Sequence, residues 1–495
     1  MGNSFMQNLQ NATNYTYTEN GALAHRTTNS AVYDMFATGG AYRRRSIEDC
    51  ILLFKNAYEE DKNLALKCLF YLRDCRGGQG ERRFFRTCFH WLCYTESEVA
   101  KTLLLQVSEY GRWDDLIYTA YETPVWNDAM VVVKTQLGLD IQCKTPSLLA
   151  KWVPSENASS RKTRKVATAV RTYLGMNHRE YRKMLSALRT RINIVEKLMS
   201  ENRWEEIEFD KLPSKAGIIY KNAFARRDIL AKKYEKFAKD TTTKVNADTL
   251  FPYEIVHKAM ESRYNYHELS GTDRAMLEKY WTNLPDYLQG EPCKLMCVVD
   301  TSASMRANRA DAPINVAIAL GMYCAERIGG PFKNNYISFS SRPQLIKVEG
   351  VDFVDKVRRI YNTNLCDNTN LLAAFKLIEQ CALQSSPEDI PDTLVVISDM
   401  QIDRGVGYND PWGTNTATEM EKLRVEWAAK GLKLPKLVYW NVDARGDANF
   451  LDNGPFVTYV SGASPTIFKS VLTGKTGYSL MLEVLLGKRY EAIQL

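Results

Sequence analysis

Two short apolar runs in the second half of the chain end in an aspartate, and this pattern limits the folds open to that half. Residues 294–299 run into Asp300, and residues 393–398 run into Asp399. Short apolar runs bounded by polar loops indicate buried strands. Strand-like and helix-like patterns alternate here, with strands predicted at 294–299, 334–339, 343–348, 393–398, 436–441 and 456–460, and helices at 311–328, 352–360, 370–383, 416–430, 464–473 and 478–487. Such alternation predicts a doubly wound, Rossmann-like α/β domain with helices on both faces of a mostly parallel sheet.

The first run opens a group of oxygen-bearing side chains. Asp300, Ser302 and Ser304 form an Asp-x-Ser-x-Ser loop, Thr369 precedes an apolar-periodic run, and Asp399 ends the second strand. Carboxylate and hydroxyl oxygens suit Mg²⁺, with Mn²⁺ or Ca²⁺ as alternatives. The loop taken alone is also typical of an Asx-turn. The order of the five positions resembles the von Willebrand factor A domain, which implies that these five residues form a metal-ion-dependent adhesion site.

The first half of the chain has helical periodicity. Apolar residues recur at spacings of three and four from about residue 46 to 285, with short turns between the periodic stretches. Helix pairs joined by short turns predict an α-helical repeat domain of the HEAT or armadillo kind. Residues 1–45 are rich in Asn, Thr and Gly and indicate an extended N-terminal arm. We therefore expect an arm at 1–45, a helical repeat domain at 46–290 and the α/β domain at 291–495.

The positive charge of the chain lies in the helical half. Residues 1–290 carry a net charge of +8, residues 291–495 carry −1, and residues 151–200 hold 12 basic against 3 acidic side chains. A basic helical face of this kind is a candidate for nucleic-acid phosphates. A solvated face that pairs with acidic residues elsewhere is the alternative. The candidate RNA-binding residues are Arg161, Lys162, Arg164, Lys165, Arg171, Arg179, Arg182, Lys183 and Arg189.

Several other classes of protein are disfavoured. No nucleophile–base pair or nucleotide loop is evident, and the five histidines form no HxxxH or HExxH pattern, so we do not expect an enzyme. The eleven cysteines contain no CxxC pair and indicate free thiols in a reducing compartment. No apolar run has the length of a membrane helix and the N-terminus lacks an apolar signal core. We therefore expect a cytoplasmic protein that does not contact a membrane.

Four phrases resemble a known family. The sequences of residues 71–82 (YLRDCRGGQGER), 110–116 (YGRWDDL), 149–152 (LAKW) and 397–403 (ISDMQID) look like the family called domain of unknown function 2828. The architecture is also similar to the Ro autoantigen and its TROVE module, which pair a ring of helical repeats with a von Willebrand A domain. That resemblance implies RNA on the basic helical half and a metal site in the α/β half.

Two functions are therefore expected from the sequence. The first is an RNA-binding scaffold whose basic helical domain holds non-coding or single-stranded RNA, while the α/β domain holds a divalent cation and an acidic group of a protein partner. The second is a metal-dependent protein–protein adaptor that binds no RNA, in which the basic face meets acidic partners.

Overall fold

A computed structural model of the chain describes residue 9 and the ranges 13–192, 194–264, 268–290, 292–339, 342–363, 369–403, 418–446 and 449–495. Helices dominate the first 282 residues. They are α2 (Ala31–Thr38), α3 (Ile47–Glu60), α4 (Lys62–Arg73), α5 (Arg82–Thr95), α6 (Ser97–Tyr110), α7 (Trp113–Ala120), α8 (Trp126–Gln142), α9 (Leu149–Trp152), α10 (Arg161–Tyr173), α11 (His178–Ile192), α12 (Val195–Ser200), α13 (Ser214–Ala225), α14 (Asp228–Lys239), α15 (Pro252–Tyr264) and α16 (Gly271–Thr282), with 3-10 turns η1 (Gly39–Arg44) and η2 (Trp204–Glu206).

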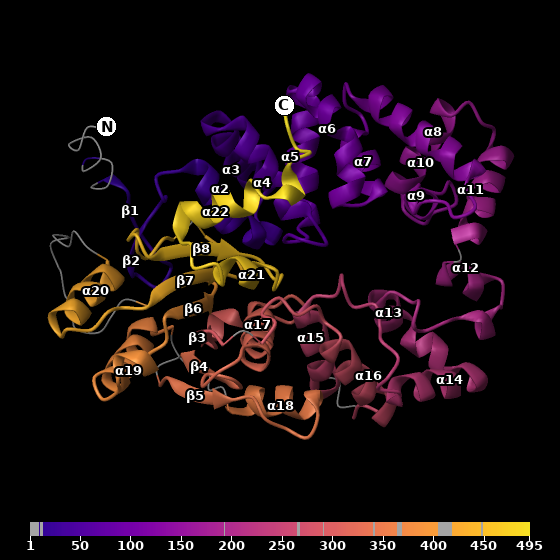
Figure 1. Cartoon of the computed structure of the whole chain (residues 1–495). Coiled ribbons are helices and arrows are strands. Elements are labelled where there is room, and N and C mark those ends of the chain that lie inside the picture. Colours follow the sequence, from indigo (N-terminus) through magenta and orange to yellow (C-terminus); the bar gives the residue numbers. More distant parts are fainter. Residues whose placement is uncertain are drawn as a thin grey trace.

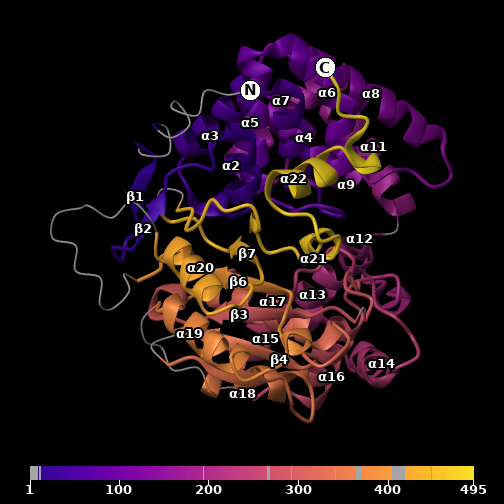
Figure 2. The ribbon, with the colours of Figure 1, turned by 60° about the vertical axis from the view of Figure 1, so that its left-hand side comes forward.

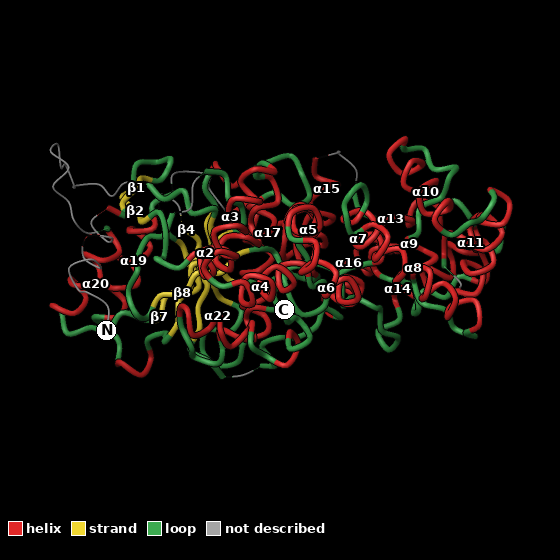
Figure 3. The backbone as a smooth tube through the Cα atoms, turned by 90° about the horizontal axis from the view of Figure 1, so that it is seen from above, coloured by secondary structure: helices red, strands yellow, loops and turns green. Residues whose placement is uncertain are grey.

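These helices follow a curved path. Successive helices from α3 to α8 pack on one another, α9 to α12 turn the chain, and α13 to α16 return toward the sheet (Figure 1). Seen from above, α8 to α11 and α13 to α14 gather at one end of an elongated molecule, and the strands lie toward the other (Figure 3). The helical first part predicted from periodicity is therefore confirmed.

The N-terminal region differs from the predicted arm from residue 31 onward. Strands β1 (Tyr15–Tyr17) and β2 (Leu23–His25) pair antiparallel, and α2 follows them. Val32, Met35 and Phe36 are buried at helical spacing, and α2 packs on α3, α4 and a strand of the α/β half. The helix is mostly apolar, but Asn, Thr and Gly residues precede and follow it, and their composition led to the prediction of an arm.

The second half is an α/β unit around one sheet. The six strands have the order β5 (Gln344–Lys347), β4 (Asn335–Phe339), β3 (Leu295–Asp300), β6 (Thr393–Ser398), β7 (Lys436–Asn441) and β8 (Val457–Ser461). All neighbours are parallel except β4 and β5. The helices are α17 (Pro313–Arg327), α18 (Phe353–Thr363), α19 (Leu371–Ala382), α20 (Glu419–Ala429), α21 (Ile467–Val471) and α22 (Gly477–Leu485), with 3-10 turns η3 (Ala303–Met305), η4 (Pro387–Asp389) and η5 (Lys488–Tyr490). The six predicted strands and the α/β class are confirmed.

The helical half meets the α/β half at both ends of the helical path. Helices α15 and α16 pack on α17 and α18, and α2 packs on β8 while α22 and η5 pack on α4 (Figures 1 and 2). The second contact contains a buried carboxylate, Asp74, which accepts hydrogen bonds from Arg489 at 2.7 and 3.0 Å and from the Tyr490 hydroxyl at 3.2 Å. Both ends of the helical path are therefore fixed to the α/β half.

Candidate nucleic-acid interface and candidate metal centre

Two parallel neighbouring strands bring Asp300 and Asp399 to one edge of the sheet. Asp300 is the last residue of β3 and Asp399 directly follows β6, and Val299 and Ile397 are register partners in the two strands. Both carboxylates are buried. In the sheet order, β3 lies between β4 and β6, so this edge is the point at which the strand order reverses. Ligands of open α/β sheets bind at such a point, outside the carboxyl ends of the strands.

The Asp-x-Ser-x-Ser loop folds around the Asp300 carboxylate. The backbone N–H of Ser302 donates to Asp300 Oδ1 at 2.9 Å, and the Ser398 hydroxyl donates to Oδ2 at 2.6 Å. The hydroxyls of Ser302 and Ser304 lie 3.1 Å apart. The carboxylate and both predicted hydroxyls are thus gathered at the edge of the sheet.

Asp399 has an oxygen without a hydrogen bond. Its Oδ1 accepts from the backbone N–H of Gln401 at 3.2 Å, whereas the buried Oδ2 accepts none from the described residues and lies 3.8 Å from Arg445 Nε. Thr369 is buried just before α19, and its carbonyl accepts the N–H of Asp403 at 3.0 Å, which ties it to the loop after Asp399.

The two buried carboxylates disfavour each other's charge. Burial raises the pKa of Asp300, and the charge of Asp399 raises it further. Burial also raises the pKa of Asp399, while Arg445 opposes that change. Two carboxylates, nearby hydroxyls and an orphaned buried oxygen are a donor set that fits a hard cation. Among the described residues no cluster of three or more His, Cys, Asp or Glu side chains is placed to bind a metal, so hydroxyls are an essential part of this set.

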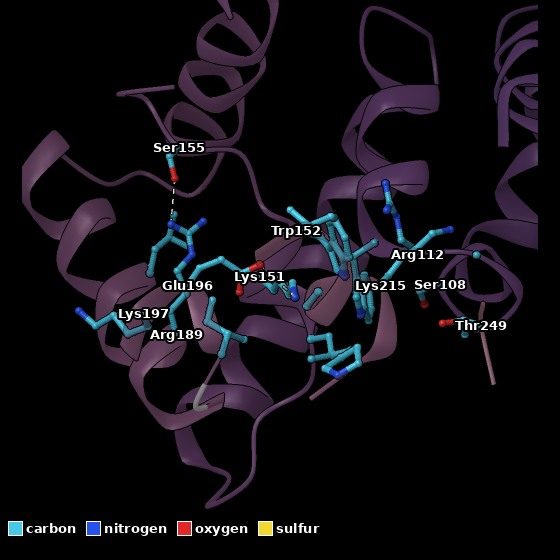
Figure 4. A pocket seen from close by; sticks show the side chains of 18 of the residues that line it. Ser108, Arg112, Lys151, Trp152, Ser155, Arg189, Glu196, Lys197, Lys215 and Thr249 are labelled. Carbon is cyan, nitrogen blue, oxygen red and sulfur yellow. Dashed lines mark hydrogen bonds and ion pairs between the residues drawn. The ribbon is translucent and has the colours of Figure 1, made fainter. Parts of the chain in front are cut away.

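A cavity of about 1640 Å³ lies in the helical half. It is lined by the turn between α4 and α5, the start of α7, α9 and the loop after it, α11, α12, α13 and the residues before α15 (Figure 4). Among the described residues that line it, ten side chains are basic and two are acidic, Glu156 and Glu196. The basic ones are Arg73, Arg76, Arg82, Arg112, Lys151, Arg179, Arg182, Arg189, Lys197 and Lys215. We call this cavity the basic pocket.

Half of these cations have carboxylate partners. The pairs are Arg73 with Asp115, Arg112 with Asp114, Lys151 with Glu196, Lys197 with Glu201, and Lys215 with Glu254. Arg76, Arg82, Arg179, Arg182 and Arg189 form no ion pair with any residue that the structure describes. Burial and the charges of two nearby guanidinium groups, Arg112 and Arg86, lower the pKa of Arg82. The basic pocket therefore carries positive charge that the protein does not neutralise.

Aromatic rings lie among the cations. The guanidinium of Arg112 is 3.8 Å from the ring centroid of Trp152, and Lys215 Nζ is 5.5 Å from that of Phe251. Trp113, Tyr181 and Tyr220 also line the basic pocket. Cations that alternate with aromatic rings are typical of grooves that hold single-stranded nucleic acid.

Three of the nine predicted RNA-binding residues line the basic pocket: Arg179, Arg182 and Arg189. The other six lie outside it. They are Arg161, Lys162, Arg164, Lys165, Arg171 and Lys183. Arg164 donates to the carbonyls of residues 158 and 159, and Arg171 pairs with Glu156 at 2.7 Å, so both have local structural roles.

Seven of the lining cations were not among the predicted RNA-binding residues: Arg73, Arg76, Arg82, Arg112, Lys151, Lys197 and Lys215. Arg73, Arg76 and Arg82 belong to the phrase at 71–82, and Arg112 and Lys151 to the phrases at 110–116 and 149–152. These phrases carried the family resemblance and were the available signal, because three of the four converge on this one cavity.

No described helix has the length and apolarity required to cross a membrane. Residues 18–109 and 148–291 match the family described as Domain of unknown function (DUF2828), and residues 294–483 match the one described as Domain of unknown function (DUF7788). The chain is 30% identical over 519 aligned positions to Uncharacterized protein L728 of Acanthamoeba polyphaga mimivirus, across 95% of this chain and 87% of that protein. The phrases at 71–82 and 149–152 lie in the DUF2828 match as predicted, whereas the phrase at 397–403 lies in the DUF7788 match and the phrase at 110–116 lies outside both. The chain therefore belongs to one family with L728.

Proposed function

We propose that the protein is an RNA-binding scaffold that holds non-coding or single-stranded RNA in the basic pocket. The observation that carries this proposal is the five lining arginines without a carboxylate partner. Phosphates are the natural counter-charge for such a site, and the lining aromatic rings offer surfaces for unpaired bases. In this proposal the architecture is that of Ro-type proteins, with a HEAT- or armadillo-like ring of helices joined to a von Willebrand A domain.

The α/β half would hold a divalent cation, Mg²⁺ or else Mn²⁺ or Ca²⁺, at the edge of the sheet. Asp300 would be the anchor carboxylate, Ser302 and Ser304 would supply hydroxyl ligands, and Thr369 and Asp399 would bind directly or through water. The buried Asp399 Oδ2 that accepts no hydrogen bond from the described residues supports this assignment. A bound Mg²⁺ supplies positive charge and an open coordination position, which suits an acidic side chain of a protein partner. No enzymatic activity is proposed.

The RNA-binding role is tested by reversing charge inside and outside the basic pocket. In the pocket variant, Arg82, Arg179 and Arg182 are replaced by glutamate. In the matched control, Arg161, Lys162 and Lys165 are replaced by glutamate, because they are also exposed but do not line the cavity. Binding of a labelled oligouridylate is measured by fluorescence anisotropy at several potassium chloride concentrations.

We expect the pocket variant to bind RNA at least about tenfold more weakly than the unchanged protein. The magnitude of the slope of log K against log salt should fall by about two, because each phosphate neutralised on a single strand contributes about 0.7. The control variant should bind within about threefold of the unchanged protein. Equal losses in the two variants would refute a site specific to the basic pocket, and a larger loss in the control would place the RNA on the α10 face. Absence of binding by the unchanged protein would favour the second candidate, a metal-dependent protein–protein adaptor, for which the metal centre is the place to seek partners.

A further inference from the structure

A short segment projects two different side chains into the basic pocket. Lys151 and Trp152 end α9, and the loop that follows also lines the cavity through Ser155. Lys151 lies 3.8 Å from Glu196 and 5.6 Å from the ring of Trp152. Because α9 is a single turn, its own backbone hydrogen bonds do little to hold this segment in place.

Arg189 holds the segment on both sides. From helix α11, its Nε donates to the carbonyl of Ala150 at 2.8 Å and its Nη2 to the carbonyl of Val153 at 2.9 Å. Its Nη1 donates to the Ser155 hydroxyl at 2.9 Å, which is the bond drawn in Figure 4. The guanidinium group thus bridges the residue before Lys151 and the residue after Trp152.

A second guanidinium group fixes the ring. Arg112 lies over Trp152, and Asp114 binds Arg112 at 2.9 and 2.7 Å, so the indole is held from the α7 side as well. Trp152 is therefore an ordered ring at the wall of the cavity, with Lys151 beside it. An aromatic ring and an ammonium group side by side match the base and phosphate of one nucleotide.

We propose that Lys151 and Trp152 form the contact site for one nucleotide of an unpaired strand, and that Arg189 is the positioning residue that holds this site in its binding geometry. This inference rests on the proposed RNA-binding function. It assigns Arg189 a structural role in addition to its positive charge, since each of its three guanidinium nitrogens already donates one N–H to the protein.

Arg191 is the matched comparison. It lies on α11 two residues after Arg189, is exposed, donates to the carbonyl of Ile141 at 3.0 Å and does not line the basic pocket. Lysine keeps the charge of arginine but loses its planar fork of donors. Arg191→Lys should therefore preserve RNA binding, whereas Arg189→Lys should not, even though both variants keep the net charge.

Binding of the labelled oligouridylate to Arg189→Lys and Arg191→Lys tests the positioning role. We expect Arg189→Lys to weaken affinity about tenfold, the equivalent of one to two lost hydrogen bonds, and Arg191→Lys to remain within about twofold. In a Trp152→Ala background, Arg189→Lys should cost only about twofold, because the side chain it positions is gone. Equal costs in the two backgrounds, or full affinity of Arg189→Lys, would overturn the positioning role.

A measurement without RNA separates this inference from the proposed function. Acylation of Lys151 by an N-hydroxysuccinimide ester, followed by mass spectrometry, should be several-fold faster in Arg189→Lys and unchanged in Arg191→Lys. Faster acylation in a protein that binds no RNA would refute the function and leave the positioning intact. Unchanged acylation in a protein that does bind RNA would refute the positioning alone. If Arg189→Lys does not fold, Ser155→Ala is decisive, with about threefold weaker binding expected and unchanged affinity counting against the proposal.

Discussion

Replacement of Asp300 by asparagine tests whether the edge of the sheet is built for a cation. The Asp300 carboxylate is fully buried near Asp399, which disfavours its charge. Asparagine keeps the acceptor for the N–H of Ser302, and its amide group faces the Ser398 hydroxyl. That hydroxyl already accepts the N–H of Met400 and has a second lone pair for the amide. The substitution therefore sacrifices at most one hydrogen bond, about 1 kcal/mol.

The relief of repulsion acts in the opposite direction. A tenfold change in proton affinity corresponds to about 1.4 kcal/mol, so in chelator at neutral pH the free energy of unfolding of Asp300→Asn should equal or exceed that of the unchanged protein by up to about 2 kcal/mol. The raised pKa of Asp300 gives the sign of the pH effect. Ionisation of the Asp300 carboxyl group is less favourable in the folded than in the unfolded protein, so the unchanged protein loses stability as the pH rises above about 4. The stability advantage of Asp300→Asn is therefore absent below a pH of about 4 and grows as the pH rises.

In magnesium, the unchanged protein should become more stable than Asp300→Asn. A ligand at a hundred times its dissociation constant stabilises a folded protein by about 2.7 kcal/mol, and we expect this gain in the unchanged protein only. Differential scanning fluorimetry in EDTA and in magnesium chloride measures both effects. A variant that is less stable than the unchanged protein in EDTA, or that gains as much from magnesium, would refute the reasoning.

Two further predictions concern the turn between α4 and α5. A Cβ on Gly78 would overlap a backbone carbonyl oxygen of α4, so Gly78→Ala should destabilise the protein by about 3 kcal/mol or more. The control Gly138→Ala, in α8 with open space around it, should stabilise by about 0.5–1 kcal/mol, both measured by urea unfolding. Asp74→Asn leaves Arg489 without its buried carboxylate and should cost about 2–4 kcal/mol by the same measurement. Glu109→Gln, which removes only the exposed partner of Arg489, should change stability by less than about 0.5 kcal/mol, and an equal effect of the two would contradict this account.

The position of the candidate metal centre was predictable because short stretches of sequence indicate where its two aspartates lie. Each aspartate directly follows an apolar run, and adjacent parallel strands place their carboxyl ends at one edge. Short apolar runs also predicted the six strands, and their alternation with helical patterns predicted the α/β class. Whether a cation occupies the edge stays a prediction, since sequence and fold give the donor set alone.

The basic pocket was only partly predictable because its charge is assembled by tertiary structure. The dense basic cluster at 161–165 led to the prediction that RNA binds at α10, yet none of its cations lines the cavity. The lining cations come singly or in small groups from segments spread between residues 73 and 215. Local charge density does not reveal such a site, since curvature of the helical path brings isolated cations together. Arg189 was identified for its charge, whereas its structural importance lies in its three donors.

The contact between Asp74 and Arg489 has a consequence for the order of events during synthesis. The two residues are 415 positions apart, and the turn that Asp74 anchors lines the basic pocket. At about 5–20 residues per second, the ribosome needs roughly 20–80 s to reach Arg489 after it has made Asp74. Throughout that interval, the buried carboxylate lacks its guanidinium partner, and the helical path lacks one of its two attachments to the α/β half. The attachment of this turn to the α/β half is thus a late product of translation, and all the described segments that line the basic pocket are synthesised before it can form.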